Sequence, residues 1–77
     1  MIKEIYVFAN LDENGEEAIV GVINKEGDEN IFLPLVANTK DMMEKMKLIA
    51  IEMAKQDNNK IKLIHFTKRR VVEEFLP

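Results

Sequence analysis

Clusters of acidic side chains are the first feature of this sequence that could do chemistry. The clusters are Asp12, Glu13, Glu16 and Glu17, and then Glu26, Asp28 and Glu29. Paired carboxylates can carry out general acid–base catalysis or bind a divalent cation. Each cluster, however, lies in a polar turn between apolar runs, and successive turns of a β-meander lie at opposite ends of the sheet. The two clusters are therefore predicted to stay apart as solvated turns.

His65 is the only histidine, and a histidine can activate a hydroxyl or thiol nucleophile. The chain has no serine and no cysteine, so that nucleophile would have to be Thr39 or Thr67. His65 lies in an apolar run, which favours a hydrogen-bonded structural role. One histidine without cysteine leaves a zinc or iron site short of ligands, and the three isolated glycines form no phosphate-binding loop. We therefore expect no catalytic residue, no metal and no cofactor, and we predict that the protein is not an enzyme.

Lys68, Arg69 and Arg70 form the best basic patch and are the candidate contacts for nucleic acid. Affinity for a phosphate backbone requires several such contacts, and it is opposed by negative charge elsewhere on the protein. The chain carries 11 basic and 14 acidic residues, a net charge of −3. Residues 1–38 carry a net −6 and residues 39–77 a net +3. Nucleic-acid binding is therefore the alternative function and not the first.

Apolar runs separated by polar turns predict the strands that position these groups. The β-rich runs are residues 5–11, 18–24, 31–36 and 61–66. Asn14-Gly15 predicts a type I′ hairpin turn between the first two strands. Gly21 indicates a bulge or a close backbone approach, and Pro34 places the third strand at a sheet edge.

Residues 40–57 are predicted to form an amphipathic helix. Asn38, Thr39 and Asp41 are alternative N-caps, and Asp57-Asn58-Asn59 ends the helix. The apolar stripe predicted to pack on the sheet consists of Met42, Met46, Ile49, Ala50 and Met53. After the last strand, Thr67 could cap a short helix that carries Val72, Phe75 and Leu76 on one face, with an irregular tail as the alternative.

The expected fold is a single α+β domain of residues 1–77 with the order β-β-β-α-β(-α). The 40–57 helix is long enough for a crossover, so the fourth strand should run parallel to the first. This predicts a mixed four-stranded sheet of order 3-2-1-4, with the long helix on one face. The element order resembles the truncated RNase-H-like domains of some bacterial antitoxins, a likeness of topology that implies no functional residue here.

All four predicted strands are apolar on both faces, unlike a half-solvated antiparallel sheet. Four strands span roughly 15–20 Å, whereas a helix with its side chains is about 10 Å wide. The helix can therefore cover one face only, and Val72, Phe75 and Leu76 can cover part of the other. An exposed apolar patch on so small a protein usually marks an interface.

Leu48 and Ile51, with Lys55 beside them, lie on the outward face of the predicted helix and are the candidate interface residues. A chain of 77 residues without disulfides or metal gains stability most readily from oligomerisation. We therefore predict a small interaction protein, either a homo-oligomer such as a homodimer or a binder of another protein. The size and composition of the chain also fit an accessory or inhibitory protein of a phage or mobile element. No signal peptide and no membrane span is recognisable, so a cytoplasmic location is expected.

Overall fold

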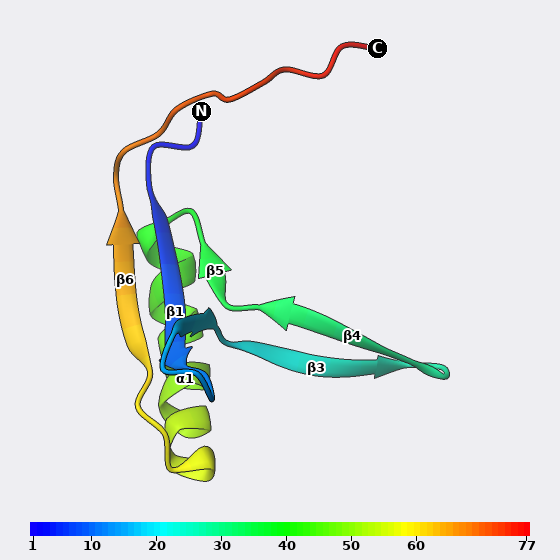
Figure 1. Ribbon diagram of the computed structural model, residues 1–77, viewed down its shortest axis with the longest axis vertical. Helices are drawn as coiled ribbons and strands as arrows, with labels where there is room; N and C mark the ends of the chain where they lie inside the picture. The colour runs from blue at the N-terminus through cyan, green and yellow to red at the C-terminus, as the bar shows by residue number, and fades with distance from the viewer.

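The computed structural model describes residues 1–77 and contains one helix and six strands. The elements are β1 (Ile5–Leu11), β2 (Glu17–Ile19), β3 (Gly21–Glu26), β4 (Glu29–Pro34), β5 (Val36–Ala37), α1 (Lys40–Asp57) and β6 (Lys62–Phe66). The predicted α+β class, with three strand regions before the helix and one after it, is confirmed. α1 packs on one face of a four-stranded sheet, and a separate two-stranded hairpin extends to the side (Figure 1).

β1 is the centre of the four-stranded sheet. β6 pairs with one of its edges, and β2 and β5 pair with the other, all antiparallel to β1. Val20 N–H donates to the Phe8 carbonyl (2.9 Å), and Phe8 N–H donates to the Leu35 carbonyl (3.1 Å). β2 and β5 therefore form one interrupted strand along β1. The interruption is the hairpin of residues 21–34, called the arm below.

The strands of the arm, β3 and β4, pair only with each other, from Gly21 opposite Pro34 to Glu26 opposite Glu29. Gly27 has a φ of 62° at the first position of the two-residue turn, where a type II′ turn requires glycine. At the base, a Cβ on Gly21 would lie 2.5 Å from the Phe32 ring and 2.6 Å from the Leu33 carbonyl oxygen. The close approach predicted at Gly21 is thus confirmed.

The predicted sheet order 3-2-1-4 and the parallel pairing of the last strand with the first are wrong. β6 is antiparallel to β1, with Val7 opposite Ile64. The reason is the interrupted strand: because the chain bends at Leu35, the end of the third strand region returns to β1 as antiparallel β5. β5 and β6 thus run parallel to each other on either side of β1, and α1 is the crossover between them.

The first hairpin is confirmed, but its turn is of another type. Gly15 has a φ of 81°, whereas Asn14 has a negative φ, so the turn is not type I′. Gly15 N–H donates to the Asp12 carbonyl (3.0 Å), and the Asp12 carboxylate accepts from the N–H groups of Asn14 and Glu16 (both 2.9 Å). This is a three-residue loop with glycine in the left-handed position.

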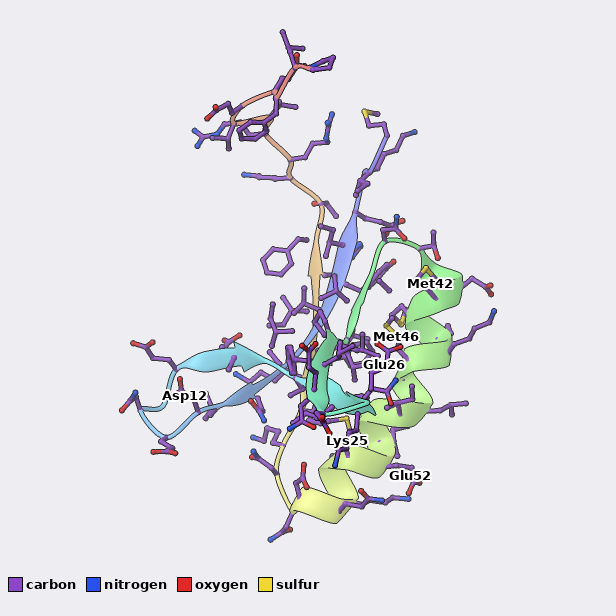
Figure 2. All side chains as sticks on the ribbon, turned by 90° about the vertical axis from the view of Figure 1, so that its right-hand side faces the viewer. Asp12, Lys25, Glu26, Met42, Met46 and Glu52 are labelled. Atoms are coloured by element: carbon purple, nitrogen blue, oxygen red, sulfur yellow. The ribbon has the colours of Figure 1, made fainter.

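α1 begins at the N-cap Thr39, whose Oγ1 accepts a hydrogen bond from Met42 N–H (3.2 Å), and it ends at Asn58 with a φ of 49°. The core between α1 and the sheet consists of Tyr6, Phe8, Val20, Leu35, Ala37, Met43 and Ala50. Met42 and Ile49, predicted for the core stripe, are 43% and 44% exposed, because Met43 and Ala50 mark the centre of the buried face. Figure 2 shows Met42 and Met46 near the beginning of the helix.

The C-terminal helix predicted as an option is absent. Residues 67–77 form an irregular, extended tail that leads away from the sheet (Figure 1). Val72, Phe75 and Leu76 are 80–86% exposed, so they do not cover the second face of the sheet as expected. An 11-residue segment without a packing partner is too short to be a stable helix in water.

Candidate functional site

The face of the four-stranded sheet opposite α1, called the open face below, is largely apolar and is not covered by another element. Its apolar residues are Ile5, Val7, Ala9 and Leu11 of β1, Ile19 of β2, Val36 of β5, and Ile64 and Phe66 of β6. Glu17 of β2 and Lys62 of β6 lie on the same face and form an ion pair (3.8 Å) across Ala9, which is buried. Leu11, Ile19 and Phe66 are each about half exposed (49–52%). The first hairpin, with Asp12 at its turn, extends away from α1 on this side (Figure 2). The predicted uncovered apolar face is therefore present.

The arm carries apolar side chains on both of its faces. Val22 lies opposite Leu33 on one face, and Ile23 lies opposite Phe32 on the other. Ile23 is 69% exposed and Phe32 is 53% exposed. An isolated two-stranded hairpin is marginally stable in water. The arm is therefore a second apolar surface without a partner in the chain.

Charged side chains of opposite sign lie at the arm tip and at one end of the open face. Three carboxylates and one cation lie at the tip: Lys25, Glu26, Asp28 and Glu29. A shallow hollow at the end of the open face is lined by Ile2, Ile5 and Phe66 together with the cations Lys3, Lys68 and Arg69 and one carboxylate, Glu4. None of these charged residues other than Glu4 has an ion-pair partner within the chain. Arg70, the third residue of the predicted basic patch, follows in the exposed tail.

The predicted interface on α1 is exposed, but its three residues have different surroundings. Leu48 is 69% exposed, and Lys55 pairs with Glu52 (3.8 Å). Ile51 lines an apolar groove of about 230 Å³ between α1 and β6. The other groove residues are Phe8, Lys47, Ala50, Ala54, Ile61 and Leu63.

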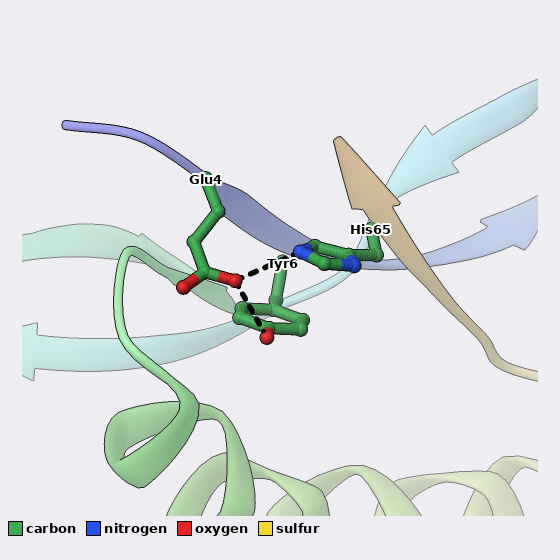
Figure 3. A network of polar contacts seen from close by, with 3 residues as sticks. All are labelled: Glu4, Tyr6 and His65. Carbon is green, nitrogen blue, oxygen red and sulfur yellow. Dashed lines mark hydrogen bonds and ion pairs between the residues drawn. The ribbon is translucent and has the colours of Figure 1, made fainter. Parts of the chain in front are cut away.

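Glu4, Tyr6 and His65 form a polar cluster at the end of the sheet (Figure 3). The Glu4 carboxylate accepts from the Tyr6 hydroxyl (2.7 Å) and from His65 Nε2 (2.8 Å), and the two rings stack 4.3 Å apart. The hydrogen bond from Tyr6, and then that from His65, lowers the pKa of Glu4 below its ordinary 4.5. The same Glu4 contact raises the pKa of Tyr6 above 10.0. His65 is thus hydrogen-bonded, as predicted.

This cluster brings no nucleophile to His65. The Thr39 hydroxyl caps α1, and Thr67 lies in the tail beyond β6. The acidic groups of the two turns lie apart, since Asp12 and the arm residue Glu26 are on different hairpins (Figure 2). No group of three or more histidine, cysteine or acidic side chains is placed to hold a metal ion.

The sequence predicted the uncovered face but not the arm. It also did not predict that Lys3 lies beside Lys68 and Arg69 at the end of the open face. A signal for the arm was present, since Gly21 and Pro34 interrupt two apolar strands and lie opposite each other. The Glu4–His65 contact joins residues 61 apart and leaves no such signal.

These features define a class: a small α+β protein with a projecting apolar arm and an open sheet face. Comparison with known proteins finds no family model, no curated relative and no solved structure that matches this chain. No helix in it is long and apolar enough to cross a membrane.

Proposed function

We propose that this protein is a small non-enzymatic interaction protein that associates with a second copy of itself. The observation that supports this is the excess of accessible surface. The chain exposes 6712 Å², whereas a compact monomer of 8.9 kDa exposes about 4,800 Å². Its radius of gyration is 14.6 Å, against about 11.5 Å for a compact domain of this length.

The size of the excess fits a dimer interface. About 1,900 Å² per chain lies beyond the compact-monomer value, and part of it belongs to the extended tail, so two copies together could bury at most almost 4,000 Å². Obligate homodimers bury about 2,000–5,000 Å² in total and have strongly apolar interfaces. The arm and the open face supply exposed apolar side chains for such an interface, and the extended tail exposes Val72, Phe75 and Leu76 in addition.

Sedimentation velocity of the intact chain over about 1–100 µM tests this proposal, a range that corresponds to ordinary dimer affinities. We expect a dimer or a larger closed oligomer throughout most of that range. A single monomeric species at about 50 µM would contradict self-association.

The α1 surface of Leu48, Ile51 and Lys55 is a second candidate contact for the same function. Leu48→Glu combined with Ile51→Glu places two charges on this exposed side of the helix. If the association constant falls, the contact includes α1; if it is unchanged, the contact lies on the arm or the open face.

Nucleic-acid binding through Lys68, Arg69 and Arg70 is the second candidate function. It is favoured by the exposure of Phe66 (52%) and Phe75 (86%) on either side of the basic run, since exposed aromatic rings can stack on bases. Titration with a single-stranded oligonucleotide should then give an affinity that falls steeply between about 50 and 200 mM salt. A flat salt response, or no binding at 50 mM salt, would exclude it.

A further inference from the structure

We propose that the arm of each copy lies along the open face of a second copy, with the acidic tip of the arm at the basic end of that face. This inference rests on the proposed self-association and names the two surfaces that make the contact. Each copy has one arm and one open face, so a two-fold exchange occupies both surfaces in both copies.

The apolar surfaces match in size. The strands of the arm have six residues, about 20 Å, and β1 has seven, about 23 Å. A face of the arm presents Ile23 and Phe32, and the open face presents Leu11, Ile19 and Phe66, all of them roughly half exposed or more. Two β-layers that pack face to face bury such side chains between them.

The charges give the contact a direction. Lys25 with Glu26, Asp28 and Glu29 gives the arm tip a net charge of −2. The receiving end of the open face carries Lys3, Lys68 and Arg69, which have no ion-pair partner in their own chain, beside Glu4, whose carboxylate accepts from Tyr6 and His65. In both Figure 1 and Figure 2 the arm and the terminal segments lie in different regions of the molecule. The tip therefore meets the basic end of another copy and not that of its own chain.

The apolar part of the contact is tested by Ile23→Asp combined with Phe32→Asp. Two carboxylates in the centre of a dry interface should raise the dimer dissociation constant about thirty-fold or more. The matched control is Met42→Glu, which also places a charge on an exposed apolar position (43% exposed) but lies in the first turn of α1, outside both the arm-to-face contact and the α1 surface of Leu48, Ile51 and Lys55. The dissociation constant of the control should stay within about twofold of the wild-type value, since a side chain outside the interface contributes little binding energy.

The charged part is tested by two charge-reversed chains. One has a basic tip (Glu26→Lys, Asp28→Lys, Glu29→Lys), and the other has an acidic receiving end (Lys3→Glu, Lys68→Glu, Arg69→Glu). Each chain alone should associate about tenfold more weakly at low salt, because tip and receiving end then carry the same sign. An equimolar mixture should form a heterodimer with an affinity close to that of the wild-type dimer, because both contacts in it pair opposite charges.

The outcomes separate this inference from the function on which it rests. A monomeric wild-type chain would contradict both the self-association and the arm-to-face contact. A wild-type dimer that is insensitive to the arm substitutions, with no heterodimer in the mixture, would overturn the arm-to-face contact and leave self-association in place. Circular dichroism of each variant checks folding, which should be unaffected because every substituted side chain is exposed.

Discussion

Glu4 is the residue with the most specific polar surroundings in the molecule. Its carboxylate accepts hydrogen bonds from Tyr6 of β1 and His65 of β6, and so links the two strands. The cluster contains an acid, a base and a phenol, yet no hydroxyl or thiol nucleophile contacts His65. Its geometry supports a structural role that holds the end of β6 against β1.

Stability should therefore depend on pH through this cluster. Because the pKa of folded Glu4 is lowered, its contribution is present above pH 4.5 and is lost as the pH falls through the lowered pKa. Because the pKa of folded Tyr6 is raised, its contribution is present below pH 10.0 and is lost as the pH rises through the raised pKa. Urea unfolding of the wild type and of Glu4→Gln from pH 3 to pH 11 measures this. The variant should lose less stability at both extremes, and identical profiles would contradict the assignment.

At the scale of the elements, the ends of α1 can be compared directly with the sequence. Asn38, Thr39 and Asp41 were equivalent N-cap candidates by residue type, and only Thr39 accepts the Met42 N–H. Thr39→Ala should lower the free energy of unfolding by about 1 kcal/mol, because a helix N–H loses its partner. Asn38→Ala is the control and should have little effect. Chemical denaturation of both variants gives the answer, and equal losses would mean that the cap is not Thr39.

The arm can be shortened without disturbing the sheet. Replacing residues 23–32 by Asn-Gly joins Val22 to Leu33, which already lie opposite each other, through a two-residue turn. The buried residues Val20 and Leu35 at the base are retained. We expect an unchanged helical circular dichroism spectrum and a protein that sediments as a monomer. A shortened chain that still dimerises would show that the arm is dispensable.

The sequence predicted local features well because these depend on nearby residues. The positions of α1, both hairpin turns and the two apolar faces of β1 follow from residue type and periodicity. The path of the chain at Val20 and Leu35 was not predicted, because the neighbouring Gly21 and Pro34 were interpreted as a bulge and an edge-strand residue and not as the base of a separate hairpin. That one bend reversed β6 relative to β1, so the local pattern was right and the sheet order was wrong.

At the scale of the whole molecule, the protein has more surface than its core can stabilise. Only eight of 77 residues are buried, so the proposed association would supply a large part of the folding free energy. The thermal midpoint should then rise with protein concentration, by several degrees for each tenfold increase, because about 1 kcal/mol shifts the midpoint of so small a domain by 4–8 °C. Calorimetry at three concentrations tests this, and a constant midpoint is expected only of a stable monomer.

The pairing of Val20 and Leu35 with one residue, Phe8, has a practical consequence for engineering. The chain leaves the sheet and re-enters it at the same point of β1, so the hairpin between them does not set the alignment of β2 or β5. Any two-stranded ribbon whose ends match Gly21 and Pro34 could be grafted there, which would make the α1-backed sheet a carrier for exchangeable recognition loops.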